Sequence, residues 1–336
     1  MSALELQDVV VDYEGRGTRV RAVAGASLSV DSGEIVGLVG ESGCGKSTLA
    51  RAAVGLVPVA EGSVRFEGTN VSPLGRRARP RELARLQLVF QNPYSSLNPR
   101  RKVGSQIADA LGTLGTAERP ARAARVQELC ELVGLPPSAV GRYPHEFSGG
   151  QRQRIAIART LAADPTVLVL DEPLASLDAS AQAQLANLLV DLSRRLQLGL
   201  LLISHDLAIV RHVADTVSVM YLGRMVEQGP TPAVWSLPLH PYTERLIGAI
   251  PHPDGSGVLP TALPGEVPDP SRPPTGCRFH PRCPYAFDRC AAEEPPLVGL
   301  ADGRLAACWL QPAGATPAPP AARTIQIPPG EPDEGE

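Results

Sequence analysis

A glycine-rich loop that directly follows a short β-branched segment constrains this chain more than any other feature. Residues Gly40–Ser47 read Gly-Glu-Ser-Gly-Cys-Gly-Lys-Ser and fit the pattern G-x-x-x-x-G-K-[ST]. The preceding segment Glu34–Val39 predicts a strand, and Thr48–Leu56 is compatible with a helix. A phosphate-binding loop requires this order, because backbone N–H groups and the positive end of the helix then point at the phosphates.

The loop also supplies two side chains suited to nucleotide chemistry. We expect Lys46 to reach the β- and γ-phosphates and Ser47 to ligate Mg²⁺. An apolar segment, Val167–Leu170, leads into Asp171 and Glu172, and sheets of this class place their sites at the carboxyl ends of strands. Asp171 suits Mg²⁺, and Glu172 suits polarisation of the attacking water. Loop and acidic strand together predict a nucleotide hydrolase without saying which kind.

Strand and helix patterns alternate through much of the chain and predict an α/β fold with a mostly parallel sheet. Besides the segments above, the predicted elements are strands at Leu4–Tyr13, Ala26–Val30, Leu86–Phe90 and Leu200–Ser204 and helices at Ala121–Val133 and Ala179–Leu196. Between the second strand and the loop strand, Asp31–Gly33 is predicted to be a hairpin turn.

Three further features indicate the kind of hydrolase. Ser148-Gly149-Gly150-Gln151 precedes a helical segment, Gln91 follows the Leu86–Phe90 strand, and His205 follows the Leu200–Ser204 strand. With the two motifs above, this set resembles the ATP-binding cassette (ABC) family. The resemblance implies an ATPase domain over 1–235 with a RecA-like parallel sheet core, an antiparallel β subdomain and a helical signature subdomain at about 92–159.

The resemblance also implies roles for individual positions. Glu172, His205 and Gln91 would be catalytic, Ser47, Gln91 and Asp171 would hold Mg²⁺, and Tyr13 would stack on adenine. The remaining ATP contacts would come from Gly40, Glu41, Ser42, Gly43, Cys44, Gly45, Lys46, Ser47, Thr48, Asp171, Ser148, Gly149, Gly150 and Gln151.

In this family the signature of one subunit closes over the ATP that is bound by another subunit. Ser148–Gln151 would therefore complete the site of a partner cassette, and Asp178 would link the two sites across the dimer. The first signature position is usually leucine, whereas this chain has Phe147, an apolar replacement. The partner is a second ABC ATPase subunit, either identical or different.

Two segments narrow the resemblance to the ATPase subunits of oligopeptide and dipeptide importers. They are Val89–Arg100, which reads Val-Phe-Gln-Asn-Pro-Tyr-Ser-Ser-Leu-Asn-Pro-Arg, and the C-terminal extension at 236–310, which contains Leu239-His240-Pro241-Tyr242-Thr243. The resemblance implies two transmembrane permease subunits, an extracytoplasmic substrate-binding protein and a peripheral location on the cytoplasmic face of the membrane. Some relatives carry nickel or other small solutes, so the solute stays open.

Four of the six cysteines lie in the extension, at Cys277, Cys283, Cys290 and Cys308. Their C-x5-C-x6-C-x17-C spacing is looser than the paired spacing of zinc sites. Four thiolates also hold [4Fe–4S] clusters, and the importer resemblance implies such a cluster here. A [4Fe–4S] cluster, zinc and reduced, packed thiols therefore remain as alternatives. The proline-rich segment 251–275 is predicted to be an extended linker, and residues 311–336 a disordered tail.

Bulk properties exclude several classes. A net charge of −3 and a pI near 6.1 give no basic footprint for nucleic acid. No apolar segment approaches the roughly 20 residues of a membrane-spanning helix, and the N-terminus does not resemble a secretory signal peptide. A soluble cassette ATPase of translation or repair remains as an alternative, although the chain has a single phosphate loop. A kinase or GTPase would leave Ser148–Gln151 and His205 without a role.

Overall fold

A computed structural model describes residues 2–15, 18–75, 79–92, 96–250 and 265–318. Pro93–Ser95 of the Val89–Arg100 segment therefore lie outside the described residues, as do 251–264 and 319–336. The described part of the linker, 265–275, contains neither helix nor strand, which agrees with the extended segment predicted there.

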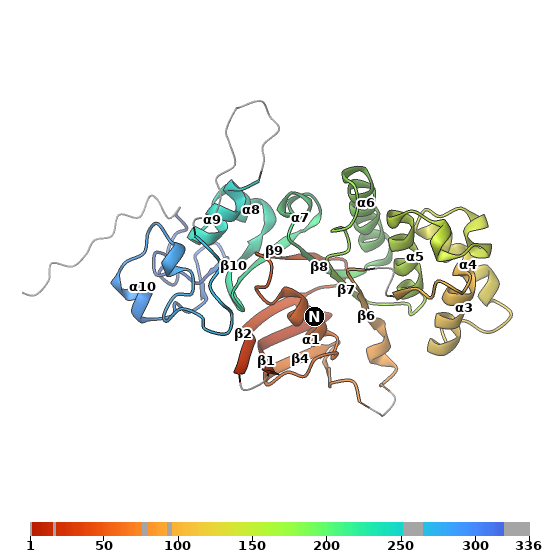
Figure 1. Ribbon diagram of the computed structural model, residues 1–336, viewed down its shortest axis with the longest axis horizontal. Helices are drawn as coiled ribbons and strands as arrows, with labels where there is room; N and C mark the ends of the chain where they lie inside the picture. Colours follow the sequence, from red (N-terminus) through yellow and green to blue (C-terminus); the bar gives the residue numbers. More distant parts are fainter. Residues whose placement is uncertain (1, 16–17, 76–78, 93–95, 251–264, 319–336) are drawn as a thin grey trace, which may run out of the picture.

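A mixed eight-stranded sheet forms the centre of the molecule (Figure 1). In spatial order its strands are β11 (Val298–Gly299), β12 (Leu305–Ala306), β10 (Arg224–Pro230), β9 (Thr216–Tyr221), β3 (Ile35–Val39), β8 (Gly199–Ser204), β7 (Val167–Asp171) and β6 (Leu86–Val89). The five strands from β9 to β6 are parallel to one another, which confirms the predicted mostly parallel sheet, whereas β10 pairs antiparallel with β9. β3, β7 and β8 are buried along their whole length, which explains their continuous apolar sequences.

A second sheet is antiparallel and lies on the other side of α1 (Lys46–Ala53). Its order is β2-β1-β4-β5, with strands β1 (Leu4–Gly15), β2 (Thr18–Val30), β4 (Glu61–Phe66) and β5 (Thr69–Asn70). One buried cluster joins residues of β1, α1 and β7, among them Leu4, Leu49 and Val169, so α1 is held between the two sheets. The hairpin predicted at Asp31–Gly33 is wrong: β2 belongs to the antiparallel sheet and β3 to the central sheet, so this turn carries the chain between layers.

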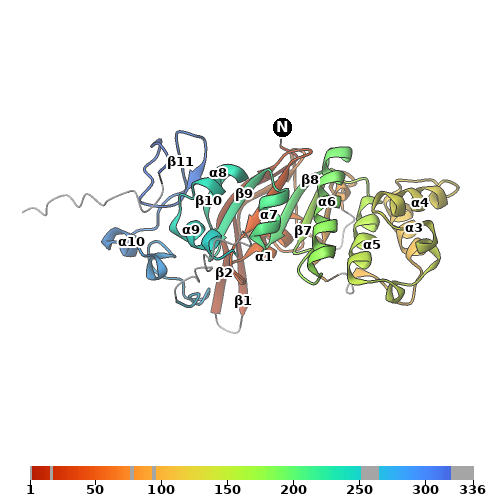
Figure 2. The same cartoon turned by 90° about the horizontal axis from the view of Figure 1, so that it is seen from above.

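Helices gather at the other face and at one end of the central sheet. α6 (Ala179–Leu196) and α7 (Leu207–Val213) pack beside it, and the segment predicted as the signature subdomain forms a separate helical group at the end (Figures 1 and 2). That group consists of α3 (Val103–Leu114), α4 (Arg122–Leu132), the 3-10 turns η2 (Pro137–Gly141) and η3 (Pro144–Glu146), and α5 (Gly149–Leu161).

The C-terminal extension lies at the opposite end from the helical group (Figure 1). It contains α9 (Pro241–Gly248), the turn η4 (His280–Arg282) and α10 (Asp288–Ala292), and it follows α8 (Thr231–Ser236). Its strands β11 and β12 continue the central sheet, because β12 pairs with β10 through Glu227–Ala306 and Gln228–Leu305. The extension is therefore built onto the ATPase sheet rather than tethered beside it. Within the described ranges, no helix combines the length and the apolar character needed to cross a bilayer.

Candidate functional site

Glycine is required at two positions of the loop between β3 and α1. Gly45, the N-cap of α1, has a φ of 106°, and a Cβ there would lie 2.3 Å from the carbonyl oxygen of Ala22. A Cβ on Gly40, whose φ is 151°, would lie 2.1 Å from the carbonyl oxygen of Met220. The chain therefore passes closely between β2 and β9, and the loop can hold its tight curve only without side chains at these two points.

The Lys46 side chain is folded back across this loop. Its Nζ donates hydrogen bonds to the carbonyl oxygens of Gly40 at 2.8 Å and Glu41 at 2.9 Å, and the residue is buried. An ammonium held over the mouth of a backbone loop at the start of a helix is the arrangement that binds phosphate groups. The predicted role of Lys46 is consistent with this placement.

Ser47, in the first turn of α1, meets the acidic end of β7. Its hydroxyl donates to Oδ1 of Asp171 at 2.7 Å. Burial raises the pKa of Asp171, and the Ser47 hydrogen bond opposes that rise. A hydroxyl and a carboxylate oxygen brought together are hard oxygen donors, which is the ligand chemistry that Mg²⁺ prefers. The donor set thus fits the predicted magnesium site.

The three predicted catalytic residues meet at the carboxylate of Glu172. Oε2 of Glu172 accepts a hydrogen bond from Nε2 of Gln91 at 3.0 Å and lies 3.4 Å from Nδ1 of His205. Glu172 has a φ of 48°, which is uncommon for a residue other than glycine. β6, β7 and β8 end side by side, so their parallel pairing brings the three residues together. The three residues therefore lie together at one edge of the sheet, while their catalytic roles stay a prediction.

Tyr13 of β1 lies at the edge of the same site. Its ring is 39% exposed, and its hydroxyl is 3.4 Å from Oγ1 of Thr48 in the first turn of α1. An exposed aromatic ring beside a phosphate loop can stack on a base. Its position agrees with the predicted adenine contact.

The Ser148–Gln151 segment stands apart from this cluster in the same chain. Ser148 and Gln151 form a reciprocal capping box at the start of α5. The nearest atoms to a Cβ on Gly149 or Gly150 would belong to Leu177 and Ala181, and not to the phosphate loop. The helix N-terminus is thus preorganised, and Asp178 likewise caps α6 through Ala181 N–H.

Two residues that were not predicted to lie at the ATP site contact Glu41 of the phosphate loop. The backbone N–H of Glu41 donates to the Tyr242 hydroxyl at 2.8 Å, and the Glu41 carboxylate pairs with Arg282. Both partners belong to the extension, about 200 residues or more from the loop. Neither residue has a local sequence signal for this role, because the contact depends on how the extension folds back.

The four extension cysteines line a single cavity, with His240 and Trp309 among their neighbours. Burial, with smaller contributions from the neighbouring cysteines, raises the pKa of Cys277 to about 11 and those of Cys283 and Cys308 to about 12. All are free thiols. In the described part of the chain, no group of three or more His, Cys, Asp or Glu side chains is arranged to hold a metal ion. This arrangement supports neither the predicted cluster nor zinc.

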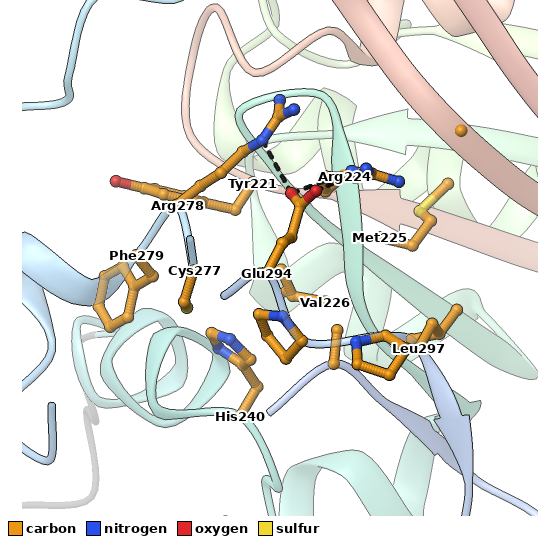
Figure 3. A pocket seen from close by; sticks show the side chains of 14 residues that line it. Tyr221, Arg224, Met225, Val226, His240, Cys277, Arg278, Phe279, Glu294 and Leu297 are labelled. Atoms are coloured by element: carbon orange, nitrogen blue, oxygen red, sulfur yellow. Dashed lines mark hydrogen bonds and ion pairs between the residues drawn. The ribbon is translucent and has the colours of Figure 1, made fainter. Parts of the chain in front are cut away.

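A larger cavity of about 300 Å³ lies beside the cysteine cavity, between β10 and the extension (Figure 3). Arg224 and Arg278 point at Glu294 from two sides, and Cys277, Phe279 and His240 lie at the other end. Both guanidinium groups are paired with the same carboxylate, which offsets one of their two positive charges. None of the lining residues belongs to the phosphate loop or to the Asp171–Glu172 pair.

Family comparison matches two parts of the chain to different family models. Residues 23–175 match the family described as ABC transporter, and residues 226–290 match the oligopeptide/dipeptide transporter C-terminal region. A probable peptide ABC transporter ATP-binding protein of Sinorhizobium fredii is 48% identical over 305 residues, covering 90% of this chain and 86% of the relative. A di/tripeptide transport ATP-binding protein of Pseudomonas aeruginosa is 48% identical over 316 residues, covering 91% and 97%.

Solved structures give the same result for the core. The ATP-binding cassette MJ0796, solved as a dimer bound to ADP and phosphate, has a TM-score of 0.60 and 25% identity and covers 68% of this chain and 98% of its own. The cbiO1 protein of Clostridium perfringens, part of an ABC transporter complex, has a TM-score of 0.61 and 26% identity and covers 70% and 91%. The roughly 30% of the chain left uncovered is close to the share taken by the extension and the C-terminal tail.

Proposed function

The chain belongs to the ATP-binding subunits of ABC transporters that carry the oligopeptide/dipeptide-type C-terminal region, and on that premise we propose that it hydrolyses ATP to power the import of di- and oligopeptides. The observation that carries the chemistry is the junction of the phosphate loop with β7, where Ser47 and Asp171 meet at 2.7 Å beside Glu172. The extension distinguishes this chain from other cassettes and points to peptides as the solute. Nickel or another small solute is the alternative.

Each residue of the junction has a role in phosphoryl transfer to water. Lys46 and the loop N–H groups would neutralise the phosphate oxygens, and Ser47 and Asp171 would hold Mg²⁺, which neutralises charge on the leaving group when bound. Glu172 would orient and polarise the attacking water. Gln91 and His205, both within reach of Glu172, would position that water against the γ-phosphate.

A second subunit is needed to complete this site. Ser148 and the N–H groups that follow it form a preorganised anion-binding helix start, but within one chain they face Leu177 and Ala181. We therefore assign them to the γ-phosphate of ATP bound by a partner ATPase subunit. A single chain should hydrolyse ATP slowly, because each site draws on two subunits.

The permease contact is best placed in a groove beside the helical group. A cavity of about 440 Å³ lies between the end of β6, the segment 96–101, α3 and α5, with Gln87, Gln106 and Arg159 in its walls. Ser96 and Asn98, in the segment that follows Gln91, also line it. Docking of permease helices here would keep this chain peripheral, on the cytoplasmic side of the membrane.

The four cysteines fit a [4Fe–4S] cluster better than a single metal ion. All four line one cavity, and their C-x5-C-x6-C-x17-C spacing is looser than the paired spacing of zinc sites. Cys277, Cys283, Cys290 and Cys308 would each hold one iron as a thiolate. The role would be structural, since the extension is too small to bury an extensive core of its own.

Reconstitution tests the function as a whole. The chain is reconstituted in liposomes with its partner ATPase subunit and the two permease subunits. Uptake of labelled di- and oligopeptides is then measured with ATP inside the liposomes and the substrate-binding protein outside. We expect uptake that stops in the Glu172→Gln variant. ATP hydrolysis that is unaffected by permeases and by the loaded binding protein would refute the transport role and favour a soluble cassette ATPase.

A further inference from the structure

The phosphate loop carries a negative charge in the place where a polyanion binds. Glu41 is the second residue of the loop, and Lys46 Nζ donates to its carbonyl oxygen at 2.9 Å. Burial raises the pKa of the nearby Cys44 thiol, and the Glu41 carboxylate adds to that rise, so its charge is felt inside the loop. An unpaired carboxylate here would repel the phosphates of ATP.

Arg282 of the extension neutralises this carboxylate. Its Nη1 donates to Oε2 of Glu41 at 2.7 Å and its Nη2 donates to Oε1 at 3.0 Å, which is a bidentate pair. The Arg282 side chain is 4% exposed and that of Glu41 is 20% exposed, so solvent screens the pair weakly. These bonds raise the pKa of Arg282 above its ordinary value, which keeps the guanidinium charged.

Arg282 also contacts two aromatic residues beside the loop. It also donates to the Tyr221 hydroxyl at 3.2 Å, and its guanidinium lies 5.8 Å and 5.9 Å from the ring centres of Tyr221 and Phe279. Tyr221, Tyr242 and Phe279 form an aromatic cluster with ring centres 4.6–5.4 Å apart, and they come from β9, from α9 and from the position just before η4, respectively. Figure 3 shows Phe279 beside Cys277.

Tyr242 supplies the second contact to the same residue of the loop. Its hydroxyl accepts the hydrogen bond of the Glu41 backbone N–H at 2.8 Å. The extension therefore contacts both the carboxylate and the backbone N–H of Glu41, whereas Lys46 of the ATPase core contacts its carbonyl oxygen.

We propose that Arg282 is a positioning residue for ATP binding: by pairing with Glu41 it removes the negative charge from the phosphate loop and holds the loop in its binding shape. The extension, which the family comparison separates from the ATPase domain, is then a working part of the ATP site. This inference rests on the proposed function, because it names a further residue that acts on the same site.

Binding of MgATP to the full-length chain, measured by displacement of a fluorescent ATP analogue, tests the proposal. Arg282→Gln should raise the Kd by about three- to tenfold, the range that couplings through a packed side chain reach. Arg282→Lys keeps the charge and should stay near the wild-type Kd. The decisive variant is the double Glu41→Gln, Arg282→Gln, in which the exposed carboxylate is gone and affinity should return toward the wild-type value.

Arg278→Gln is the matched control. Arg278 lies just before η4 in the sequence, and its side chain, which is 15% exposed, pairs with Glu294. No hydrogen bond or ion pair found for it among the described residues reaches the phosphate loop. The Arg278→Gln variant should have a lower thermal midpoint and an unchanged Kd for MgATP. This result would separate a loss of stability in the extension from an effect on ATP binding.

The outcomes distinguish this proposal from the proposed function. A wild-type Kd in Arg282→Gln, with binding abolished in Lys46→Ala, would overturn the role of Arg282 and leave the ATP site intact. A double variant that binds as weakly as Arg282→Gln would overturn charge neutralisation as the cause. Absence of ATP binding in the wild-type chain would refute the proposed function itself.

Discussion

The hydroxyl of Ser47 donates a 2.7 Å hydrogen bond to Oδ1 of Asp171, although the two residues are 124 positions apart. This contact joins the first turn of α1 to the carboxyl end of β7, so the phosphate loop and the acidic strand form one site. Because the two oxygens lie together, a substitution of either residue should weaken Mg²⁺ binding more than it weakens nucleotide binding.

Ser47→Ala should therefore separate metal binding from nucleotide binding. Loss of the hydroxyl removes one oxygen ligand, and we expect kcat to fall by about 100-fold or more, since bound metal stabilises the transition state by several kcal/mol. Steady-state hydrolysis over a magnesium titration checks this, with nucleotide binding in EDTA as the second readout. Ser47→Thr is the control, because it keeps the hydroxyl and the sequence pattern. Equal magnesium dependence in Ser47→Ala and wild type would remove Ser47 from the metal site.

Glu172→Gln should abolish turnover while ATP still binds. The amide keeps the shape and the hydrogen-bonding reach of the side chain, but it cannot polarise water, and we expect kcat to fall by about 10²–10⁴-fold. With ATP bound and not hydrolysed, the two cassettes should remain closed, which size-exclusion chromatography with and without ATP detects. Glu128→Gln on α4, where the carboxylate only pairs with Arg125 on the surface, is the control. Hydrolysis at the wild-type rate in Glu172→Gln would refute its assigned role.

Local patterns located the phosphate loop and the acidic end of β7, and the roles of Gln91 and His205 were assigned by resemblance. The glycine loop, β7 and the polar residues after β6 and β8 could be placed because parallel strands end at one edge of a sheet. The helix at Ala179–Leu196 was predicted with the bounds of α6, because its apolar spacing and the Asp178 cap are both local. The signature could be assigned to a partner subunit only by resemblance.

Contacts between distant segments were not predictable in this way. The turn at Asp31–Gly33 looks like a hairpin, yet tertiary packing separates the strands that it joins into two sheets. Strands β11 and β12 have two residues each and carry no periodicity, so their addition to the central sheet went unforeseen. The pairing of Arg282 with Glu41 was missed for the same reason, since 241 residues separate the partners.

The cysteine cavity leads to a prediction about metal content. Anaerobically purified protein should contain about four iron and four sulfide per chain and no stoichiometric zinc, as for a [4Fe–4S] cluster with four thiolate ligands. Cys290→Ser should lose iron and lower the thermal midpoint, because metal binding contributes to folding of the segment. Cys130→Ser is the matched control, since Cys130 is buried in the helical group far along the chain. Fully folded wild-type protein without iron would favour packed thiols.

A buried glutamate in β10 should make stability depend on pH. Glu227 is fully buried, and burial raises its pKa to about 7 from an ordinary 4.5, although hydrogen bonds from the backbone N–H groups of Leu239 and His240 oppose the rise. A raised pKa in the folded state means that the folded protein binds this proton more tightly than the unfolded chain does. The contribution to stability is therefore complete below about pH 4.5 and is lost as the pH rises toward 7.

Glu227→Gln isolates that contribution. On going from pH 7.5 to pH 5.5, the unfolding free energy of the wild type should rise by about 2 kcal/mol relative to that of the variant, at 1.36 kcal/mol per pKa unit. Urea unfolding of both proteins at the two pH values measures the difference. Glu293→Gln, at an exposed carboxylate, should show no such change relative to wild type. A constant difference between wild type and Glu227→Gln would show that Glu227 stays ionised throughout.

Gly104 in the first turn of α3 should be intolerant of a single added methyl group. A Cβ there would lie 2.3 Å from Cγ1 of Val140 and 2.9 Å from its carbonyl oxygen, so η2 would have to move away from the helix. We expect Gly104→Ala to destabilise the protein by about 1–3 kcal/mol, the usual cost of overpacking. Gly141→Ala is the control, because a Cβ at that neighbouring glycine would meet no atom within 4 Å. Thermal unfolding compares the two variants. Equal midpoints would mean that η2 can move away from α3 without a loss of stability, and would contradict this prediction.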